Sequence, residues 1–373
     1  MKDFERPTVN DAVEDDTRFF INVARGLAIF LMLWGHCIQC CCLGDFDFYE
    51  NGVFRVIYSF HMPLFMLISG YLFFYSARKR NLRELLIHKT QSLLQPIIMC
   101  GILYYFLCTA LRNLIFGHDL TFFMGGYWIN GYFEQYWFLW SVLAASLAVG
   151  FSIKITDKKW LQAILLVVGM VFVSMMPCYE NNLYMYPFFV AGFLFAKFKD
   201  TKILKKINFL KYLSIPLFPV MMLFFKKEHY IYASGIFGSD RLISLDRLVK
   251  NLPINLFRWA IGLVGSIFVL TLLELIFKFI VLKIKKPIIS KGIGKIGEKS
   301  LQIYILSIIF LSDYLPDVYG KVKELVGYNV LAQNTILYNF VYTLLLAVAY
   351  SFILYFINRV LEKIKVSKIL FGK

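Results

Sequence analysis

The chain alternates long apolar runs with short polar segments along almost its whole length. Because about 20 apolar residues are enough to cross the hydrocarbon layer as a helix, each run is a candidate membrane span. The ten candidates, by residue number, are 18–42, 53–75, 93–116, 136–153, 160–176, 183–198, 208–225, 254–277, 300–315 and 336–357. The pattern therefore predicts an all-α integral membrane protein, a bundle of about ten transmembrane helices.

The basic residues of the intervening segments indicate how this bundle is oriented. Short cytoplasmic loops carry an excess of Lys and Arg. If the N-terminus lies inside, 28 of the 40 basic residues fall on the inner segments and seven on the outer loops. This alternation predicts that both termini of the chain are cytoplasmic.

Composition supports the same class of protein. Of the 373 residues, 59% are hydrophobic and 17% are charged, and the mean hydropathy is +0.64. A soluble domain carries about a quarter of its residues as charges, so the apolar surface here needs lipid to cover it. The net charge of +16 is accounted for by topology and by contact with anionic lipid, and no nucleic-acid partner is expected.

The polar segments divide the chain into three parts. Residues 1–17 are acidic and lack the basic region of a signal peptide, so we expect the first span to be retained. Residues 18–357 form the predicted membrane domain, and residues 358–373 form a basic cytoplasmic tail. The longest outer loop, 226–252, is too short to be an enzyme domain. Any chemistry must therefore take place among the helices.

Four cysteines gather at the outer end of the first span, namely Cys37, Cys40, Cys41 and Cys42. Beside a histidine they suggest a metal or redox site, but no second His/Cys cluster of matching spacing occurs elsewhere. We therefore expect small apolar thiols in a helix and no metal. A disulfide with Cys178, also predicted to lie outside, stays open as an alternative.

The first span carries an arginine and a histidine in register. Arg25 and His36 are eleven residues apart, which is three helical turns plus about 20°, so they share one face roughly 16 Å apart along the axis. A permanent cation that binds anions thus lies below a titratable base, at a separation close to the reach of a coenzyme A pantetheine arm. The alternative is that Arg25 extends to the inner headgroups and His36 packs against a polar neighbour.

The second span adds another imidazole and two further arginines. His61 falls in its outer half, within Phe60–Phe73, where Pro63 and Gly70 are expected to loosen the helix. On the inner side Arg80 and Arg83 are one helical turn apart, a spacing that can hold a phosphate group. The alternative for these two arginines is a positively charged inner loop that binds no ligand.

Together these segments resemble the acyltransferase-3 family of integral membrane acyltransferases. The family's Arg-x10-His pair, its Pro-Leu-Phe…Ser-Gly-Tyr-Leu segment and its Arg-x-x-Arg element match residues 25–36, 63–72 and 80–83. The aromatic start of the fourth span at 136–139 and the late segment 297–304 also match. The Phe-His-Met-Pro-Leu-Phe form is most similar to the branch that contains fucose O-acetyltransferase-like proteins.

The resemblance implies a donor and roles for the site residues. The donor would be acyl-CoA, most simply acetyl-CoA, whose phosphates Arg25, Arg80 and Arg83 would bind. His36 would act as general base on the acceptor hydroxyl, or would carry the acyl group transiently. The supporting residues implied, which orient the base or the acceptor or donate a hydrogen bond, are His61, Ser69, Glu134, Tyr136 and Trp137.

The resemblance also implies the acceptor and the location. The acceptor would be a hydroxyl of an extracytoplasmic or lipid-linked glycan, and the chain would be a multi-pass protein of a bacterial plasma (inner) membrane, in contact with its lipid. The sequence does not fix an oligomeric state.

Two positions depart from the family pattern. Asn22 stands where an aspartate often precedes the motif arginine, and Ser307 follows the late segment where a histidine is common. The second departure leaves His36 with more of the catalytic role.

A different class of function, an exporter or flippase of a polysaccharide or lipid-linked sugar, also fits a bundle with buried polar residues. A purely structural membrane partner does not explain the Arg25–His36 alignment.

Overall fold

The structure is a computed structural model that describes residues 9–41, 47–104, 133–231, 235, 245–281, 288–311 and 336–372. Within those ranges every regular element is a helix, which confirms the all-α prediction. The principal helices are α1 (Val9–Cys40), α2 (Gly52–Arg78), α3 (Leu82–Lys89), α6 (Trp137–Lys154), α7 (Lys159–Ser174), α8 (Tyr179–Phe198), α9 (Lys202–Ile207), α10 (Ser214–Phe224), α11 (Leu245–Ile276), α12 (Ile288–Glu298), α13 (Ser300–Leu311), α15 (Thr343–Lys363) and α16 (Ser367–Phe371).

Among the described residues, six helical segments are long and apolar enough to cross a membrane. They are Asp16–Cys40, Gly52–Arg78, Trp137–Lys154, Lys202–Phe224, Leu245–Phe279 and Leu337–Lys363. All six coincide with predicted spans, so the chain is a multi-pass membrane protein.

Of the other four predicted spans, two do not meet that criterion and two are not fully described. Helix α7 is apolar but has only 16 residues, and α8 has 20 residues but begins with polar ones. The predicted spans 93–116 and 300–315 run beyond the described residues, which end there at 104 and 311. The count of ten and the cytoplasmic termini stay predictions.

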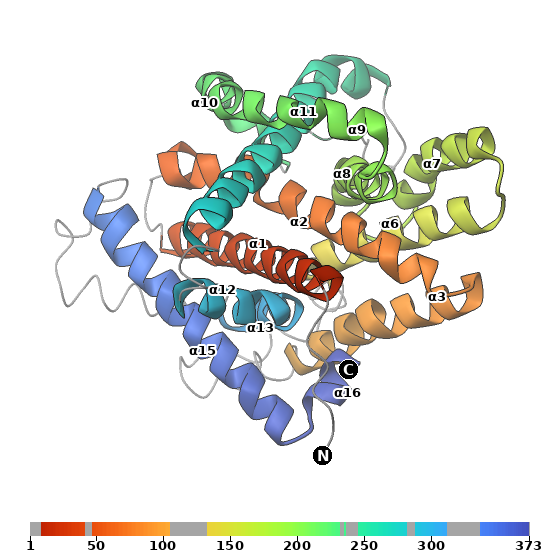
Figure 1. Cartoon of the computed structure of the whole chain (residues 1–373). Coiled ribbons are helices and arrows are strands. Elements are labelled where there is room, and N and C mark those ends of the chain that lie inside the picture. Colours follow the sequence, from red (N-terminus) through yellow and green to blue (C-terminus); the bar gives the residue numbers. More distant parts are fainter. Residues whose placement is uncertain are drawn as a thin grey trace.

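Helices α1 and α2 run antiparallel through the middle of the bundle (Figure 1). Helix α2 packs against α8 and α11 on one side, and α1 packs against α12, α13 and α15 on the other. Asn51 begins α2, because its side chain accepts a hydrogen bond from the backbone N–H of Phe54 at 3.0 Å. Pro63 lies inside this helix without ending it, as neighbouring helices allow in a membrane bundle.

Glycines set the distance between α2 and α8. A Cβ added to Gly70 would lie 1.9 Å from the Phe189 carbonyl oxygen, and one added to Gly192 would lie 1.9 Å from that of Leu67. The two backbones are therefore in direct contact, as small residues permit between membrane helices. Gly70, which the sequence suggested as a loosening point, is instead the point where α2 is fixed to α8.

A second crossing of the same design joins α1 to α12. A Cβ on Gly26 would lie 2.0 Å from the Ile293 carbonyl oxygen, and one on Gly297 would lie 1.8 Å from that of Asn22. Each helix again supplies one glycine that faces a carbonyl of the other. These two crossings fix the neighbours of the central helix pair.

The second crossing can be tested with two alanines in the same helix. Gly297→Ala should lower the thermal midpoint of the detergent-purified protein, because overpacking of this kind costs about 1–3 kcal/mol. Gly292→Ala is the matched control, since a Cβ at Gly292 meets nothing within 4 Å. The control should be neutral or slightly stabilising, because alanine favours helix over glycine. Equal effects of the two variants on the midpoint would contradict the close crossing.

Candidate functional site

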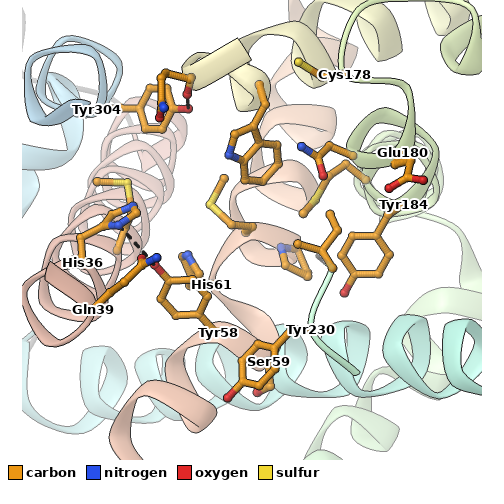
Figure 2. Close-up of a pocket in the computed structure, with 18 of the residues that line it drawn as sticks. His36, Gln39, Tyr58, Ser59, His61, Cys178, Glu180, Tyr184, Tyr230 and Tyr304 are labelled. Atoms are coloured by element: carbon orange, nitrogen blue, oxygen red, sulfur yellow. Dashed lines mark hydrogen bonds between the residues drawn. The ribbon is translucent and has the colours of Figure 1, made fainter. Parts of the chain in front are cut away.

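A cavity of about 1040 Å³ lies between α1, α2, α8, α13 and the start of α6 (Figure 2). Four of the residues predicted from sequence line it, namely His36, His61, Glu134 and Trp137. Their elements are distant in the chain, so the fold brings these side chains together. The wall combines aromatic side chains with about as many polar ones, so it can hold a ligand that has both apolar faces and hydrogen-bonding groups.

Tyr58 lies between His36 and His61, two of the three histidines that line the cavity. Its hydroxyl is 3.3 Å from His36 Nδ1 and donates to Gln39 Oε1 at 3.2 Å. The Tyr58 ring centroid is 4.6 Å from that of His61 and 6.1 Å from that of His36. Helix periodicity explains the grouping, because Tyr58 precedes His61 by three residues and Gln39 follows His36 by three. Figure 2 shows these four side chains as one cluster.

The hydrogen bonds of this cluster assign the protons of both rings. His61 Nδ1 is 2.9 Å from the Ile57 carbonyl oxygen, which can only accept, so Nδ1 carries a proton. The Tyr58 hydroxyl donates its proton to Gln39, so its oxygen can accept a hydrogen bond from His36 Nδ1–H. In the neutral form of each ring the lone pair is therefore on Nε2. In that form each imidazole can accept a proton there.

A second, smaller cavity of about 140 Å³ lies beside Arg25. Ser69 and Ser300 line it together with apolar side chains of α2 and α6. The Arg25 guanidinium donates through Nη2 to Ser300 Oγ at 2.8 Å, so it is held at the start of α13. Asn22, which replaces the family's aspartate, donates to Glu298 Oε1 at 3.2 Å. A carboxylate therefore stands near Arg25, but it comes from α12.

The two cavities follow each other along the same helices. On α1, Arg25 lines the smaller cavity and His36 the larger; on α13, Ser300 lines the smaller and Ser307 the larger. Helix α2 runs the opposite way, and there Ser69 lines the smaller cavity and His61 the larger. The sequence placed a path from Arg25 to His36 along one helix. In the structure three helices, α1, α2 and α13, each contribute residues to both cavities along that path.

One wall of the larger cavity depends on a buried arginine. Arg258 of α11 is 3% exposed and donates to the carbonyl oxygens of Glu228–Tyr230 at 3.2, 3.0 and 2.9 Å. It also donates to Asn255 Oδ1 at 2.9 Å, and its guanidinium lies over the Tyr184 ring, 5.4 Å from the centroid. An isolated buried charge would be costly, and here the surrounding acceptors offset that cost. Arg258 therefore holds the turn whose side chains line the cavity.

An ion pair joins this turn to the segment before α2. Lys227 Nζ lies 2.5 Å from Asp47 Oδ2, and the Tyr49 backbone N–H donates to Asp47 Oδ1 at 3.0 Å. The lysine hydrogen bond, followed by that backbone bond, holds the pKa of Asp47 below its usual value. Tyr49 lines the cavity, and Lys227 lies over its ring. The pair thus ties two walls together outside the membrane-spanning helices.

Three predicted site residues line neither cavity. Arg80 donates through Nη1 to the Ser76 carbonyl at 3.2 Å and to its hydroxyl at 3.0 Å, so it caps the end of α2. Arg83 is exposed in the first turn of α3. Tyr136 is fully buried beside the start of α6. The two arginines are at the same end of the bundle as the Arg25 end of α1, because α1 and α2 are antiparallel.

The cysteines contribute no metal site in the part of the chain that the structure describes. Cys37 and Cys41 are buried, while Cys40 and Cys178 line the larger cavity, and all four are free thiols. Cys42 lies outside the described residues. The disulfide alternative for Cys178 is not formed with any described cysteine.

The sequence interpretation missed several side chains of the larger cavity. Tyr58 and Gln39 could have been found, because each lies one turn from a predicted histidine on the same helix face. Glu180, Tyr184 and Tyr230 could not have been found in this way, because they reach the cavity only through tertiary packing.

Comparison with known proteins gives curated relatives for part of the chain. It is similar to nodulation protein NolL of Sinorhizobium fredii, with 30% identity over 187 residues, 46% of this chain and 47% of that protein. It is also similar to nodulation protein NolL of Mesorhizobium japonicum, with 28% identity over 179 residues, 47% of this chain and 46% of that protein. The chain thus matches about half the length of these relatives. No solved structure matches the chain.

The family comparison covers far more. The acyltransferase-3 family model, described as an acyltransferase domain, matches residues 18–356, which include both cavities and the Arg25–His36 pair. This multi-pass membrane protein therefore belongs to the acyltransferase-3 family of membrane acyltransferases.

Proposed function

We propose that this protein is a membrane O-acyltransferase that takes an acyl group from cytoplasmic acyl-CoA, most simply acetyl-CoA. It transfers this group to a hydroxyl of an extracytoplasmic or lipid-linked glycan. The observation that supports the proposal most directly is the succession of two cavities along α1, one beside Arg25 and the next beside His36. A donor with phosphates at one end and a thioester at the other fits that order.

The donor binds from the end of the bundle where Arg25 lies. Coenzyme A presents phosphates, and guanidinium groups bind phosphate through charge-assisted hydrogen bonds. Arg25 is fixed by Ser300, while Arg80 and Arg83 are close to the solvated surface and can turn toward the nucleotide. Ser69 and Ser300 offer hydroxyls to the pantetheine amides on the way to the larger cavity.

Transfer takes place in the larger cavity. His36 Nε2 accepts the proton of the acceptor hydroxyl as the hydroxyl oxygen attacks the thioester carbonyl carbon. The carbon–sulfur bond breaks, the acyl group stays on the acceptor oxygen, and the imidazolium returns the proton to the coenzyme A thiolate. Tyr58 and Gln39 hold the His36 ring, and His61 is a second neutral imidazole beside them. An acyl-His36 intermediate is a second route through the same groups.

The acceptor occupies the part of the larger cavity that the acyl end of the donor leaves open. Glu134, Trp137, Tyr184 and Tyr230 all line this cavity. Aromatic rings with polar tips suit a ligand that has both apolar faces and hydroxyl groups, as a sugar ring does. Tyr136, buried directly before α6, supports Trp137 from outside the cavity lining.

The second candidate function is export of a polysaccharide or lipid-linked sugar. The larger cavity has room for a sugar, which favours it. A passage for a glycan must continue to the other end of the bundle, however, and the adjoining cavity there has a volume of about 140 Å³. That narrowing supports a path for a thin pantetheine arm over one for a sugar chain.

The donor side requires a defined topology. A cysteine introduced as Arg80→Cys should react with a membrane-impermeant maleimide only after cells are permeabilised, because residue 80 is predicted to face the cytoplasm. Lys250→Cys, exposed in the first turns of α11 at the end that is predicted to lie outside, is the matched control and should react in intact cells. Labelling of position 80 in intact cells would contradict the donor side and the ten-span topology together.

The two surface arginines can be tested by coenzyme A binding. Replacing both Arg80 and Arg83 by Ala should weaken binding at least about tenfold, since each charge-assisted contact contributes about 1.5–3 kcal/mol. Lys158→Ala with Lys159→Ala removes two exposed charges that are predicted to face the same side, and it should leave affinity unchanged. Calorimetry on purified protein measures both. Equal affinities for the two double variants would leave Arg80 and Arg83 as topology signals only.

The base can be tested by substitution. His36→Ala and His36→Gln should each lower the rate of acyl transfer by about 10²–10⁴-fold or more, which is the usual contribution of a general base. His61→Ala should lower it less, because only His36 shares the Arg25 face of α1. Coenzyme A affinity should barely change, since the arginines hold the phosphates. Near-normal transfer by either His36 variant rules this mechanism out.

A further inference from the structure

Two side chains belong to the linings of both cavities, Met62 of α2 and Tyr304 of α13. They therefore lie at the boundary between the smaller cavity, beside Arg25, and the larger cavity, beside His36. Each is only 7% exposed, so both are packed against other groups. Met62 directly follows His61, which lines the larger cavity. Tyr304 lies about one helical turn after Ser300, which lines the smaller cavity.

The two sides of this boundary differ in stiffness. The Tyr304 ring packs edge-on against Phe138, with centroids 5.5 Å apart, and its hydroxyl donates to the Gln135 carbonyl at 3.5 Å. Phe138 in turn packs against Phe65 at 5.6 Å. Tyr304 is thus held by Phe138 of α6 and by Gln135, just before that helix. Met62 has an unbranched side chain with three rotatable bonds, so it is the member that can move aside.

We propose that Met62 and Tyr304 form an aperture that selects acyl groups by cross-section, passing unbranched acyl groups and excluding those branched next to the carbonyl. This inference rests on the proposed function, because it requires the acyl end of coenzyme A to pass from the Arg25 cavity to His36. A linear acyl group is about as thin as the pantetheine arm that follows it. A group branched at its α-carbon is wider at the point that must pass first.

The aperture does not discriminate between acyl groups by chain length. A longer unbranched group passes as the arm itself does, and the cavity of about 1040 Å³ beyond the aperture has room for it. Butyryl-CoA and isobutyryl-CoA are therefore the probes of choice, since they are isomers that differ only in branching. Shape discrimination of this kind by an apolar pocket typically reaches about 10–200-fold in kcat/KM.

The test compares the two isomers in the same preparation, by the kcat/KM for coenzyme A release from the full-length protein with cell-envelope extract as acceptor source. The native protein should favour butyryl-CoA by at least about tenfold. Met62→Ala should reduce that preference several-fold, because it removes the movable side of the aperture. Met62→Leu keeps the volume and should retain the preference. A ratio within one preparation is independent of how much of a variant has folded.

The possible outcomes separate this inference from the proposed function. Turnover with the same isomer ratio in the native protein and in Met62→Ala overturns the aperture and leaves the acyltransferase standing. A native protein that uses both isomers equally has the same meaning. Absence of coenzyme A release with acetyl-CoA and with both isomers overturns the proposed function, and the aperture with it.

Discussion

The close approach of backbones at two glycine crossings is the constraint on which the site depends. Gly26 is the neighbour of Arg25, and Gly70 is the neighbour of Ser69, so each crossing lies beside a residue of the smaller cavity. Gly297 lies one turn before Ser300, the hydroxyl that accepts from Arg25. Because α12 packs directly on α1 and α13 follows α12 immediately, the start of α13 lies next to the Arg25 guanidinium. Bulkier residues would move these groups apart by the width of a side chain.

Buried polar groups in this bundle are placed where acceptors and donors already exist. The Arg258 guanidinium is surrounded by three carbonyls and an amide, and the Arg25 guanidinium by the start of a helix. Two imidazoles contact one tyrosine. Ionisable groups in a membrane domain are costly unless satisfied in this way, and a protein keeps them where they act. The polar groups of the bundle thus outline one path, with a cation at one end and bases at the other.

The sequence predicted the parts of this path that follow from helix periodicity. Arg25 and His36 share a face of α1, and both line cavities, because three turns of one helix separate them. His61 could be placed near them from its span, but the tautomer that Ile57 imposes could not. Arg80 was predicted to contact phosphate, whereas in this structure it caps its own helix, an interaction that the same spacing allows equally well.

Features that depend on contacts between distant segments were beyond the sequence. The residues around Gly297 do not indicate that its backbone contacts Asn22. The turn held by Arg258 likewise follows only from the tertiary fold. The boundary at Met62 and Tyr304 arises because two helices of opposite direction present those side chains at the same level. The number of spans is also uncertain from hydropathy alone where helices are short, as α7 shows.

The proposed mechanism requires coenzyme A to lie along α1 with its thiol among the histidines. A cryo-electron microscopy structure of the full-length protein with bound coenzyme A measures this directly. We expect the pyrophosphate at the Arg25 end of the bundle and the sulfur in the larger cavity, within hydrogen-bonding reach of His36 or of a group bound to it. Coenzyme A bound with its sulfur outside that cavity, or with its phosphates away from Arg25, Arg80 and Arg83, would rule out this mechanism.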